Sequence, residues 1–404
     1  MANLIVGQSG GPTAVINSSL AGVFSAARNL GVQKIYGMKN GIKGFLRGDN
    51  VDLSSVFDSD EKINLLKQTP ASYLGSCRYK LPDPSGGAEI YTKIFNSLDE
   101  MDVKYFLYIG GNDSMDTIKK LSDYGKNIGS EICFMGVPKT IDNDLAVTDH
   151  SPGFGSAAKF IATAVRELVC DCRIYDVPAV TIIEIMGRNA GWLSASAALA
   201  KSDDCEGADF IYLPEKIFDV DDFLGKVENL ARKKGSVVVA ASEGIKVSDG
   251  RFVCELATGD GAEDVFGHRL LSGAGKYLEG KIKSSLGGIK CRAIELSTLQ
   301  RCASHIASRT DVEEAFMVGY ESAKAAFNGE TGRVAYFERT CENPYRCEIR
   351  TCDVSEIANI EKKVPTEWIC DGYVTDKIVD YIRPLIQGEV PLAFSNGLPK
   401  LLRP

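Results

Sequence analysis

The residues best suited to chemistry in this 404-residue chain lie in the segment PKTIDND, residues 138–144. It carries two carboxylates two positions apart, Asp142 and Asp144. One can act as a general base while the other binds a metal or orients a partner. Lys139 adds a cation, which suits the negative charge that develops in phosphoryl transfer. The alternative interpretation is a solvated turn rich in Asp and Asn.

Two glycine-containing segments could hold phosphate groups. Residues 10–11 are a glycine pair after a short apolar run, and glycine lets backbone N–H groups approach an anion at a helix N-terminus. The segment GGNDS, residues 110–114, repeats this pattern and adds Asn112 and Asp113, whose oxygens suit Mg²⁺. The alternatives are a tight turn for the first segment and, for the second, a helix N-cap from one of residues 112–114.

A third segment, MGRNAGW at residues 186–192, contains Arg188, and arginine can bind phosphate through two parallel hydrogen bonds. An ordinary surface arginine in a turn is the alternative. Two other segments resemble nucleotide-binding motifs without matching them. GAGK at 273–276 lacks the first glycine and the Ser or Thr of a phosphate-binding loop. GFGSAA at 153–158 has dinucleotide-type spacing but follows no predicted strand.

Composition excludes several classes of protein. The formal charge is −8 with no basic run, which argues against a nucleic-acid partner. No apolar stretch is long enough for a transmembrane helix and the N-terminus lacks signal-peptide features, so we expect a cytoplasmic protein without a membrane partner. Three histidines and twelve scattered cysteines offer little to a zinc enzyme or a Ser-His-Asp hydrolase, and reduced thiols are expected.

The elements that must position these segments are short apolar strands alternating with helices. We predict helices at 14–30 and near 115–121, and strands at 4–7, 34–37, 105–109, 132–138, 179–185 and 237–241. Strands of this apolar kind, separated by helices, are typical of parallel sheets covered on both faces. Because ligands bind beyond the carboxyl ends of such strands, the polar segments above should gather there.

The predicted fold class is therefore α/β. It comprises two doubly wound, mostly parallel-sheet Rossmann-like domains and a C-terminal extension. The predicted boundaries are 1–150, 151–300 and 301–404, the last segment completing both domains before a less regular, proline-containing end.

Taken together, the motifs resemble those of 6-phosphofructokinases, most closely the pyrophosphate-dependent branch. The resemblance covers about residues 3 to 335. It rests on an ordered set of matches: GGPTAVIN (10–17), LGSCR (74–78), GGNDS, PKTIDND, MGRNAGW, SEG (242–244), Arg292 and Arg301.

The resemblance implies a reversible, Mg²⁺-dependent transfer from diphosphate to fructose 6-phosphate, in glycolysis or gluconeogenesis. The first part, 1–150, would bind the phosphoryl donor and 151–300 the sugar phosphate. Asp142 would be the base that takes the proton of the sugar 1-hydroxyl. The residues implied in catalysis are Asp113, Lys139, Thr140, Asp142 and Arg188. Those implied in substrate binding are Gly11, Arg78, Thr140, Ile141, Asp142, Asp144, Met186, Gly187, Arg188, Glu243, Arg292, Thr298 and Arg301.

Two positions bear on the choice of donor. ATP-using relatives carry glycine where this chain has Asp113 and Lys139. A carboxylate at the first position would face the α-phosphate of a nucleotide. Two like charges about 4 Å apart repel by roughly 4 kcal/mol at an effective dielectric constant of about 20. Lys139 can supply positive charge to the transferring group, so we expect diphosphate as the donor.

The chain also departs from the family pattern. Asn112 stands where relatives often carry a metal-binding Asp, so the expected Mg²⁺ ligands are Asn112, Asp113 and Asp144, with the diphosphate itself. Thr298 replaces a histidine that ATP-dependent relatives use for the sugar phosphate. Ala179 stands where some relatives have an arginine that reaches across the subunit interface.

Two alternatives stay open from the sequence. One is a non-catalytic regulatory subunit, against which the intact Asp142 and Arg188 argue. The other is an ATP-dependent kinase, or one acting on another sugar phosphate such as sedoheptulose 7-phosphate. Asp113 and Lys139 argue against ATP, while the sugar is left open. A homo-oligomer, dimer or tetramer, is implied by the resemblance.

Overall fold

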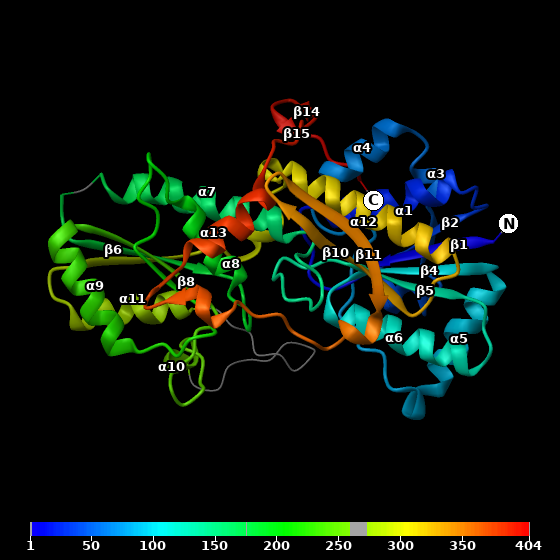
Figure 1. Cartoon of the computed structure of the whole chain (residues 1–404), viewed down its shortest axis with the longest axis horizontal. Coiled ribbons are helices and arrows are strands. Elements are labelled where there is room, and N and C mark those ends of the chain that lie inside the picture. Colours follow the sequence, from blue (N-terminus) through cyan, green and yellow to red (C-terminus); the bar gives the residue numbers. More distant parts are fainter. Residues whose placement is uncertain (1, 175, 259–272, 404) are drawn as a thin grey trace.

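The computed structural model describes residues 2–174, 176–258 and 273–403. Two sheets lie side by side along the long axis of the molecule, and helices cover both faces of each (Figure 1). The prediction of an α/β fold with two mostly parallel, doubly wound sheets is confirmed. None of the described helices is long and apolar enough to cross a membrane.

The larger sheet has the strand order β11-β10-β5-β4-β1-β2-β3. Its inner strands run parallel, while β3 and β11 are antiparallel to their neighbours. The strands are β1 (Asn3–Gln8), β2 (Ile35–Met38), β3 (Asn50–Asp52), β4 (Val103–Gly110), β5 (Cys133–Pro138), β10 (Arg333–Glu342) and β11 (Tyr345–Asp353).

Alternating side chains of β1 show why its central residues, 4–6, are all apolar. Leu4 and Val6 pack with α1 (Ile16–Asn29) and α12 (Arg309–Phe327), while Ile5 packs with the opposite helix layer. Since successive side chains of a strand point to opposite faces, a sheet covered on both sides needs consecutive apolar residues in the middle of its strands. The opposite layer consists of α5 (Pro84–Glu100) and α6 (Asn112–Asn127), and α2 (Gly41–Phe45), α3 (Leu53–Val56) and α4 (Asp60–Gln68) complete the lobe.

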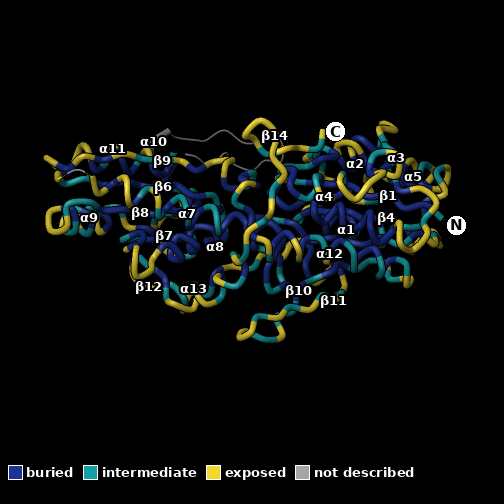
Figure 2. The backbone as a smooth tube through the Cα atoms, turned by 90° about the horizontal axis from the view of Figure 1, so that it is seen from above, coloured by how far each residue is buried: buried dark blue, intermediate teal, exposed yellow. Residues whose placement is uncertain are grey.

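The smaller sheet is parallel throughout, with the order β7-β8-β6-β9. The strands are β6 (Ala179–Ile185), β7 (Phe210–Tyr212), β8 (Ser236–Ser242) and β9 (Lys290–Glu295). One face packs on α7 (Phe154–Cys172), α8 (Trp192–Ala195) and α13 (Asp376–Ile382), the other on α9 (Val220–Lys234) and α11 (Ala274–Ser285). Figure 2 shows that the inner strands β1, β4, β6 and β8 are mostly buried, while many of the loops are exposed.

The end of the chain is more regular than predicted. β10 and β11 form a long hairpin that extends the larger sheet beside β5, although the sequence favoured a less regular, proline-containing end. The prolines misled the prediction: Pro344 lies in the turn between the two strands and interrupts neither.

Short elements complete the chain. They are α10 (Glu255–Thr258), η1 (Ser196–Ala200), η2 (Ser297–Arg301), η3 (Ser304–Ile306), η4 (Val354–Glu356), η5 (Thr366–Trp368), η6 (Arg383–Ile386), β12 (Ile369–Cys370), β13 (Tyr373–Val374), β14 (Phe394–Ser395) and β15 (Leu398–Pro399). The β14–β15 hairpin projects from the upper edge in Figure 1.

Candidate active site

A cavity of about 670 Å³ lies where the carboxyl ends of strands from both sheets meet. The loops after β1, β4 and β5 form one wall, and those after β6 and β8 form the other. The predicted residues that line it are Gly11, Arg78, Asn112, Asp113, Lys139, Thr140, Ile141, Asp142, Asp144, Met186, Arg188, Glu243 and Arg301. Three predicted residues do not line it: Gly187, Arg292 and Thr298.

The glycine turn after β1 rests on a buried lysine. Gly10 has a φ of +75°, in the left-handed region that favours glycine. The Lys139 Nζ donates a hydrogen bond of 2.7 Å to the carbonyl oxygen of Gly11. The LGSCR segment packs on the same turn, because the Ser76 hydroxyl donates to the Gly10 carbonyl at 2.6 Å. This packing carries Arg78 to the cavity.

The second glycine segment opens α6. The N-cap is Gly111, with no side-chain cap, so the prediction of an N-cap from residues 112–114 is wrong. Asn112 and Asp113 lie instead in the first turn and border the cavity. The Oδ1 atom of Asn112 is buried and has no hydrogen-bond partner among the described residues, so it is available to a cation.

Asp142 is the central carboxylate of the site. Its backbone N–H donates to the Thr140 hydroxyl at 3.1 Å. Burial raises the pKa of Asp142, and the cations Lys139, Arg188 and Arg301 oppose that shift. A carboxylate with a raised pKa is a stronger base, so this environment favours proton abstraction near neutral pH.

Burial shifts the pKa values of two neighbouring groups as well. Burial and the charge of Asp142 raise the pKa of Asp144 to about 7. Burial lowers the pKa of Lys139 to about 8, although Asp142 and Asp144 favour its charged form. Such shifted groups in one cavity are typical of a catalytic site.

The wall from the smaller sheet is built around Gly187, whose φ is +132°. The Gly187 N–H donates to Oε1 of Glu243 at 3.3 Å, and its carbonyl accepts from the Ser242 hydroxyl at 2.6 Å. Gly187 therefore joins the MGR and SEG motifs and holds Glu243 beside the cavity. Burial raises the pKa of Glu243 to about 7.

The two predicted phosphate-binding arginines lie in different places. Arg301, at the end of η2, lines the cavity, and its Nη1 would be 3.4 Å from a methyl group added to Gly11. Arg292 on β9 is half exposed outside the cavity, where it pairs with Asp171 and donates to the Thr181 hydroxyl at 3.1 Å. Thr298 is exposed. The structure thus brings one of these arginines to the site within a single chain.

Two cavity residues come from a segment without any recognisable motif. Asn359, with a φ of +63°, donates to Oδ1 of Asp116 at 3.0 Å. Glu361 accepts a hydrogen bond of 3.0 Å from Asn189, which links the C-terminal segment to the loop after β6. No periodicity or local spacing distinguishes these residues, so the sequence did not predict them.

The two nucleotide-like segments have their helix N-termini occupied by carboxylates. Asp311 accepts from the backbone N–H groups of Gly153 and Ser156 at the start of α7. Glu184 accepts from Gly273 and Gly275 at the start of α11. A bound phosphate would meet a negative charge in either place, which agrees with setting both segments aside.

None of the twelve cysteines is paired in a disulfide. In the ranges that the structure describes, no group of three or more His, Cys, Asp or Glu side chains could hold a metal ion. A divalent cation in the cavity could take the Asn112 amide oxygen and phosphate oxygens as ligands.

The comparisons with known proteins agree with this geometry. The chain is 44% identical to the pyrophosphate--fructose 6-phosphate 1-phosphotransferase of Xanthomonas campestris, over 98% of the chain and 95% of the relative. Pyrophosphate-dependent phosphofructokinases from Marinobacter aquaeolei and Nitrosospira multiformis share the fold. Their TM-scores are 0.87 and 0.89 and their identities 38% and 37%, and each match covers 100% of this chain and 96% of the other. The phosphofructokinase family model matches residues 3–326, and the chain belongs to this family.

Proposed function

We propose that this protein transfers a phosphoryl group from diphosphate to the 1-hydroxyl of fructose 6-phosphate, giving fructose 1,6-bisphosphate and phosphate. The observation that carries the proposal is the buried Asp142, which lies in a cavity shared by phosphate-type glycine loops and basic side chains. The names of the relatives over nearly the whole chain support the same donor and acceptor.

In this proposal Asp142 accepts the proton of the sugar hydroxyl as that oxygen attacks phosphorus. The charges of Lys139 and Arg188 act on the Asp142 carboxylate and oppose the rise in its pKa, so they can also stabilise the transferring group. Thr140 fixes the backbone of Asp142 through its hydroxyl. Because transfer from diphosphate releases less free energy than transfer from ATP, the reaction would run in either direction, in glycolysis or gluconeogenesis.

Asp113 and Lys139 account for the choice of diphosphate. Asp113 is exposed in the first turn of α6, where the N–H groups of the helix would otherwise attract the α-phosphate of a nucleotide. Lys139 is tied to the glycine turn, so its charge lies beside the donor. A diphosphate ends before reaching Asp113, whereas a nucleotide continues toward it.

Magnesium fits this site as a partner of the donor. Asn112, Asp113 and Asp144 would hold it together with diphosphate oxygens, and the unpartnered Asn112 oxygen supports this. When bound, the ion neutralises phosphate charge. The cavity supplies hard oxygen ligands without a three-carboxylate cluster, which matches how Mg²⁺ binds along with substrate phosphates.

The sugar phosphate would lie against Met186, Glu243 and Arg301. Arg292 points away from the cavity of its own chain, so a contact with the 6-phosphate requires another copy of the chain. We therefore propose a homo-oligomer, with 1–150 mainly binding the donor, 151–300 the sugar phosphate, and 301–404 completing both. The glycolytic substrates support a cytoplasmic location.

The deciding experiment compares donors and acceptors on the purified protein. The assay measures kcat/KM with diphosphate and with ATP, using fructose 6-phosphate and sedoheptulose 7-phosphate as acceptors, with and without Mg²⁺. We expect turnover with diphosphate and fructose 6-phosphate that requires Mg²⁺, and far lower turnover with ATP. Absence of turnover with every donor would instead support a regulatory subunit, and preference for ATP would refute the donor assignment.

A further inference from the structure

We infer that Tyr381, on the C-terminal helix α13, is a positioning residue that aims the base Asp142 by holding Asn143. This inference rests on the proposed phosphotransferase function. It assigns a role in the reaction to the part of the chain beyond the family match, which ends at residue 326.

Asn143 lies between the two site carboxylates and is fully buried. Its φ is +55°, in the left-handed region that a residue other than glycine adopts at a cost. This turn lets Asp142 and Asp144, its neighbours on either side, both border the cavity. The direction of the base therefore depends on what keeps Asn143 in this conformation.

Two hydrogen bonds hold the Asn143 side chain. Its Oδ1 accepts from the backbone N–H of Ser151 at 2.9 Å, and its Nδ2 donates to the hydroxyl of Tyr381 at 2.8 Å. The first bond lies within the loop itself. The second comes from 238 residues further along the chain, so it ties the loop to a separate helix.

The Tyr381 hydroxyl is itself fixed. It donates to the backbone carbonyl of Asp149 while accepting from Asn143. The ring lies 5.1 Å from that of Trp192, and the Arg339 guanidinium lies 4.9 Å above it. A hydroxyl with both hydrogen-bonding roles used and a packed ring can hold its partner in one place.

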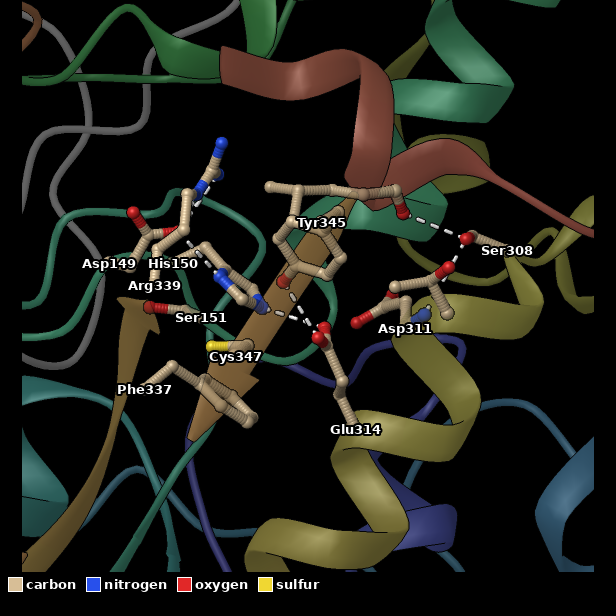
Figure 3. Close-up of polar contacts among 12 residues, drawn as sticks. Asp149, His150, Ser151, Ser308, Asp311, Glu314, Phe337, Arg339, Tyr345 and Cys347 are labelled. Atoms are coloured by element: carbon tan, nitrogen blue, oxygen red, sulfur yellow. Dashed lines mark hydrogen bonds and ion pairs between the residues drawn. The ribbon is translucent and has the colours of Figure 1, made fainter. Parts of the chain in front are cut away.

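The far end of the loop is anchored by charged groups around Asp149. Figure 3 shows the Asp149 carboxylate beside His150 and Arg339, and His150 reaching Glu314 on α12. Lys362 donates to the carbonyl of Asp149 at 2.7 Å. The Asp149 carbonyl thus accepts from both Lys362 and the Tyr381 hydroxyl, while its carboxylate is bound by His150 and Arg339. These contacts fix Asp149, and through the Tyr381 hydroxyl they fix the position of Asn143.

Removing the Tyr381 hydroxyl should affect chemistry more than binding. The groups proposed to bind the substrates, such as Gly11, Glu243 and Arg301, line the cavity, whereas Tyr381 does not. A small misplacement of a catalytic group lowers the rate steeply, since the reaction depends on alignment. We expect Tyr381→Phe to lower kcat by about tenfold or more, with both KM values within about twofold of wild type.

Tyr373→Phe is the matched control. Tyr373 belongs to the same C-terminal segment, and its buried hydroxyl has no hydrogen-bond partner in the described part of the chain. Its kcat should stay at the wild-type value. Tm is measured for all variants, because a loss of stability alone would leave kcat unchanged well below the transition.

A double mutant tests whether Tyr381 acts through Asn143. Glycine tolerates the positive φ at this position but has no side chain, so Asn143→Gly removes the bond to Tyr381 from its other end, together with the bond from Ser151. Adding Tyr381→Phe to Asn143→Gly should lower kcat by less than about twofold further, because coupled residues are not additive. If Tyr381→Phe does not fold, a wild-type kcat in Asn143→Gly overturns the inference, and a kcat loss with unchanged KM supports the part of it that assigns the aim of Asp142 to the Asn143 side chain.

Wild-type kcat in Tyr381→Phe, or a full additional loss on the Asn143→Gly background, would overturn the inference. A KM rise without a kcat loss would also overturn it. An inactive wild-type protein would instead refute the proposed function, and this inference with it.

Discussion

The two walls of the cavity differ in how completely one chain builds them. In the wall from the larger sheet, Gly11 lies on the loop after β1, and Lys139 and Asp142 lie on the loop after β5. Lys139 joins the two loops through its hydrogen bond to Gly11. The wall from the smaller sheet supplies Arg188, Glu243 and, through η2, Arg301, but it leaves Arg292 outside. The groups proposed to carry the chemistry are thus assembled within one chain, while the proposed grip on the sugar phosphate is incomplete.

Strand geometry explains the difference. Residues just beyond the carboxyl ends of parallel strands converge at one edge of a sheet, as the loops after β1, β4 and β5 do. Arg292 lies within β9, where side chains alternate between faces. Since Cys291 packs into the core with α9 and α11, Arg292 must point toward the α7 face. There it pairs with Asp171 and donates a hydrogen bond to the Thr181 hydroxyl.

The largest effect should come from Asp142→Asn, which keeps the shape of the base and removes its proton-accepting charge. Loss of a general base typically lowers the rate by about 10²–10⁴. We expect kcat to fall by that factor while calorimetry shows nearly unchanged binding of fructose 6-phosphate. Turnover near the wild-type value would show that Asp142 is not the base. The proposed chemistry would then not belong to the larger-sheet wall.

Lys139→Met should come next, because it removes a buried cation while filling similar space. Loss of one group that stabilises the developing charge costs about 10²–10³ in rate, so diphosphate kcat should fall by that factor. Because burial lowers the pKa of Lys139 to about 8, it is charged below that pH and neutral above. Wild-type activity should therefore decline above about pH 8, and the variant should lack this decline. The same decline in both proteins would exclude Lys139 as its cause.

Arg301→Ala tests the smaller-sheet wall. A charge-assisted hydrogen bond contributes about 1.5–3 kcal/mol, so the KM for fructose 6-phosphate should rise roughly tenfold or more. The KM for diphosphate should change much less. A larger rise for diphosphate would assign Arg301 to the donor side, next to Gly11.

Arg292→Ala complements the Arg301→Ala experiment, since Arg292 lies outside the cavity of its own chain. A rise in the KM for fructose 6-phosphate without a change in kcat would support a contribution from a second copy. An unchanged KM would show that Arg292 has no part in the acceptor site.

The smallest effect should follow Asp113→Gly, which removes the charge proposed to repel ATP. Asp113 is exposed, so solvent screens the repulsion to about 1 kcal/mol, and kcat/KM with ATP should rise roughly fivefold. The ratio of the two donors, measured in parallel with wild type, is the readout. An unchanged ratio would leave Asp113 without a role in donor choice.

Much of the larger-sheet wall could be predicted from sequence, because each of its motifs is short and follows an apolar strand. The parallel-sheet rule then brings the motifs together. Asn359, Glu361 and Tyr381 could not be predicted in this way. Their contacts join positions far apart in the sequence, and no local spacing distinguishes them. The exterior position of Arg292 depends on the alternation of β9, a strand that the sequence analysis did not identify.

The return of the chain to the larger sheet has a consequence for biosynthesis. α1 contacts α12 so closely that a methyl group on Gly22 would lie 1.9 Å from the Phe316 carbonyl oxygen, and β10 joins the sheet later still. The lobe built on the larger sheet therefore cannot complete its core while the ribosome is still translating the lobe built on the smaller sheet. Such long-range closure slows folding, so the nascent N-terminal half must stay unaggregated until roughly the last fifth of the chain has emerged.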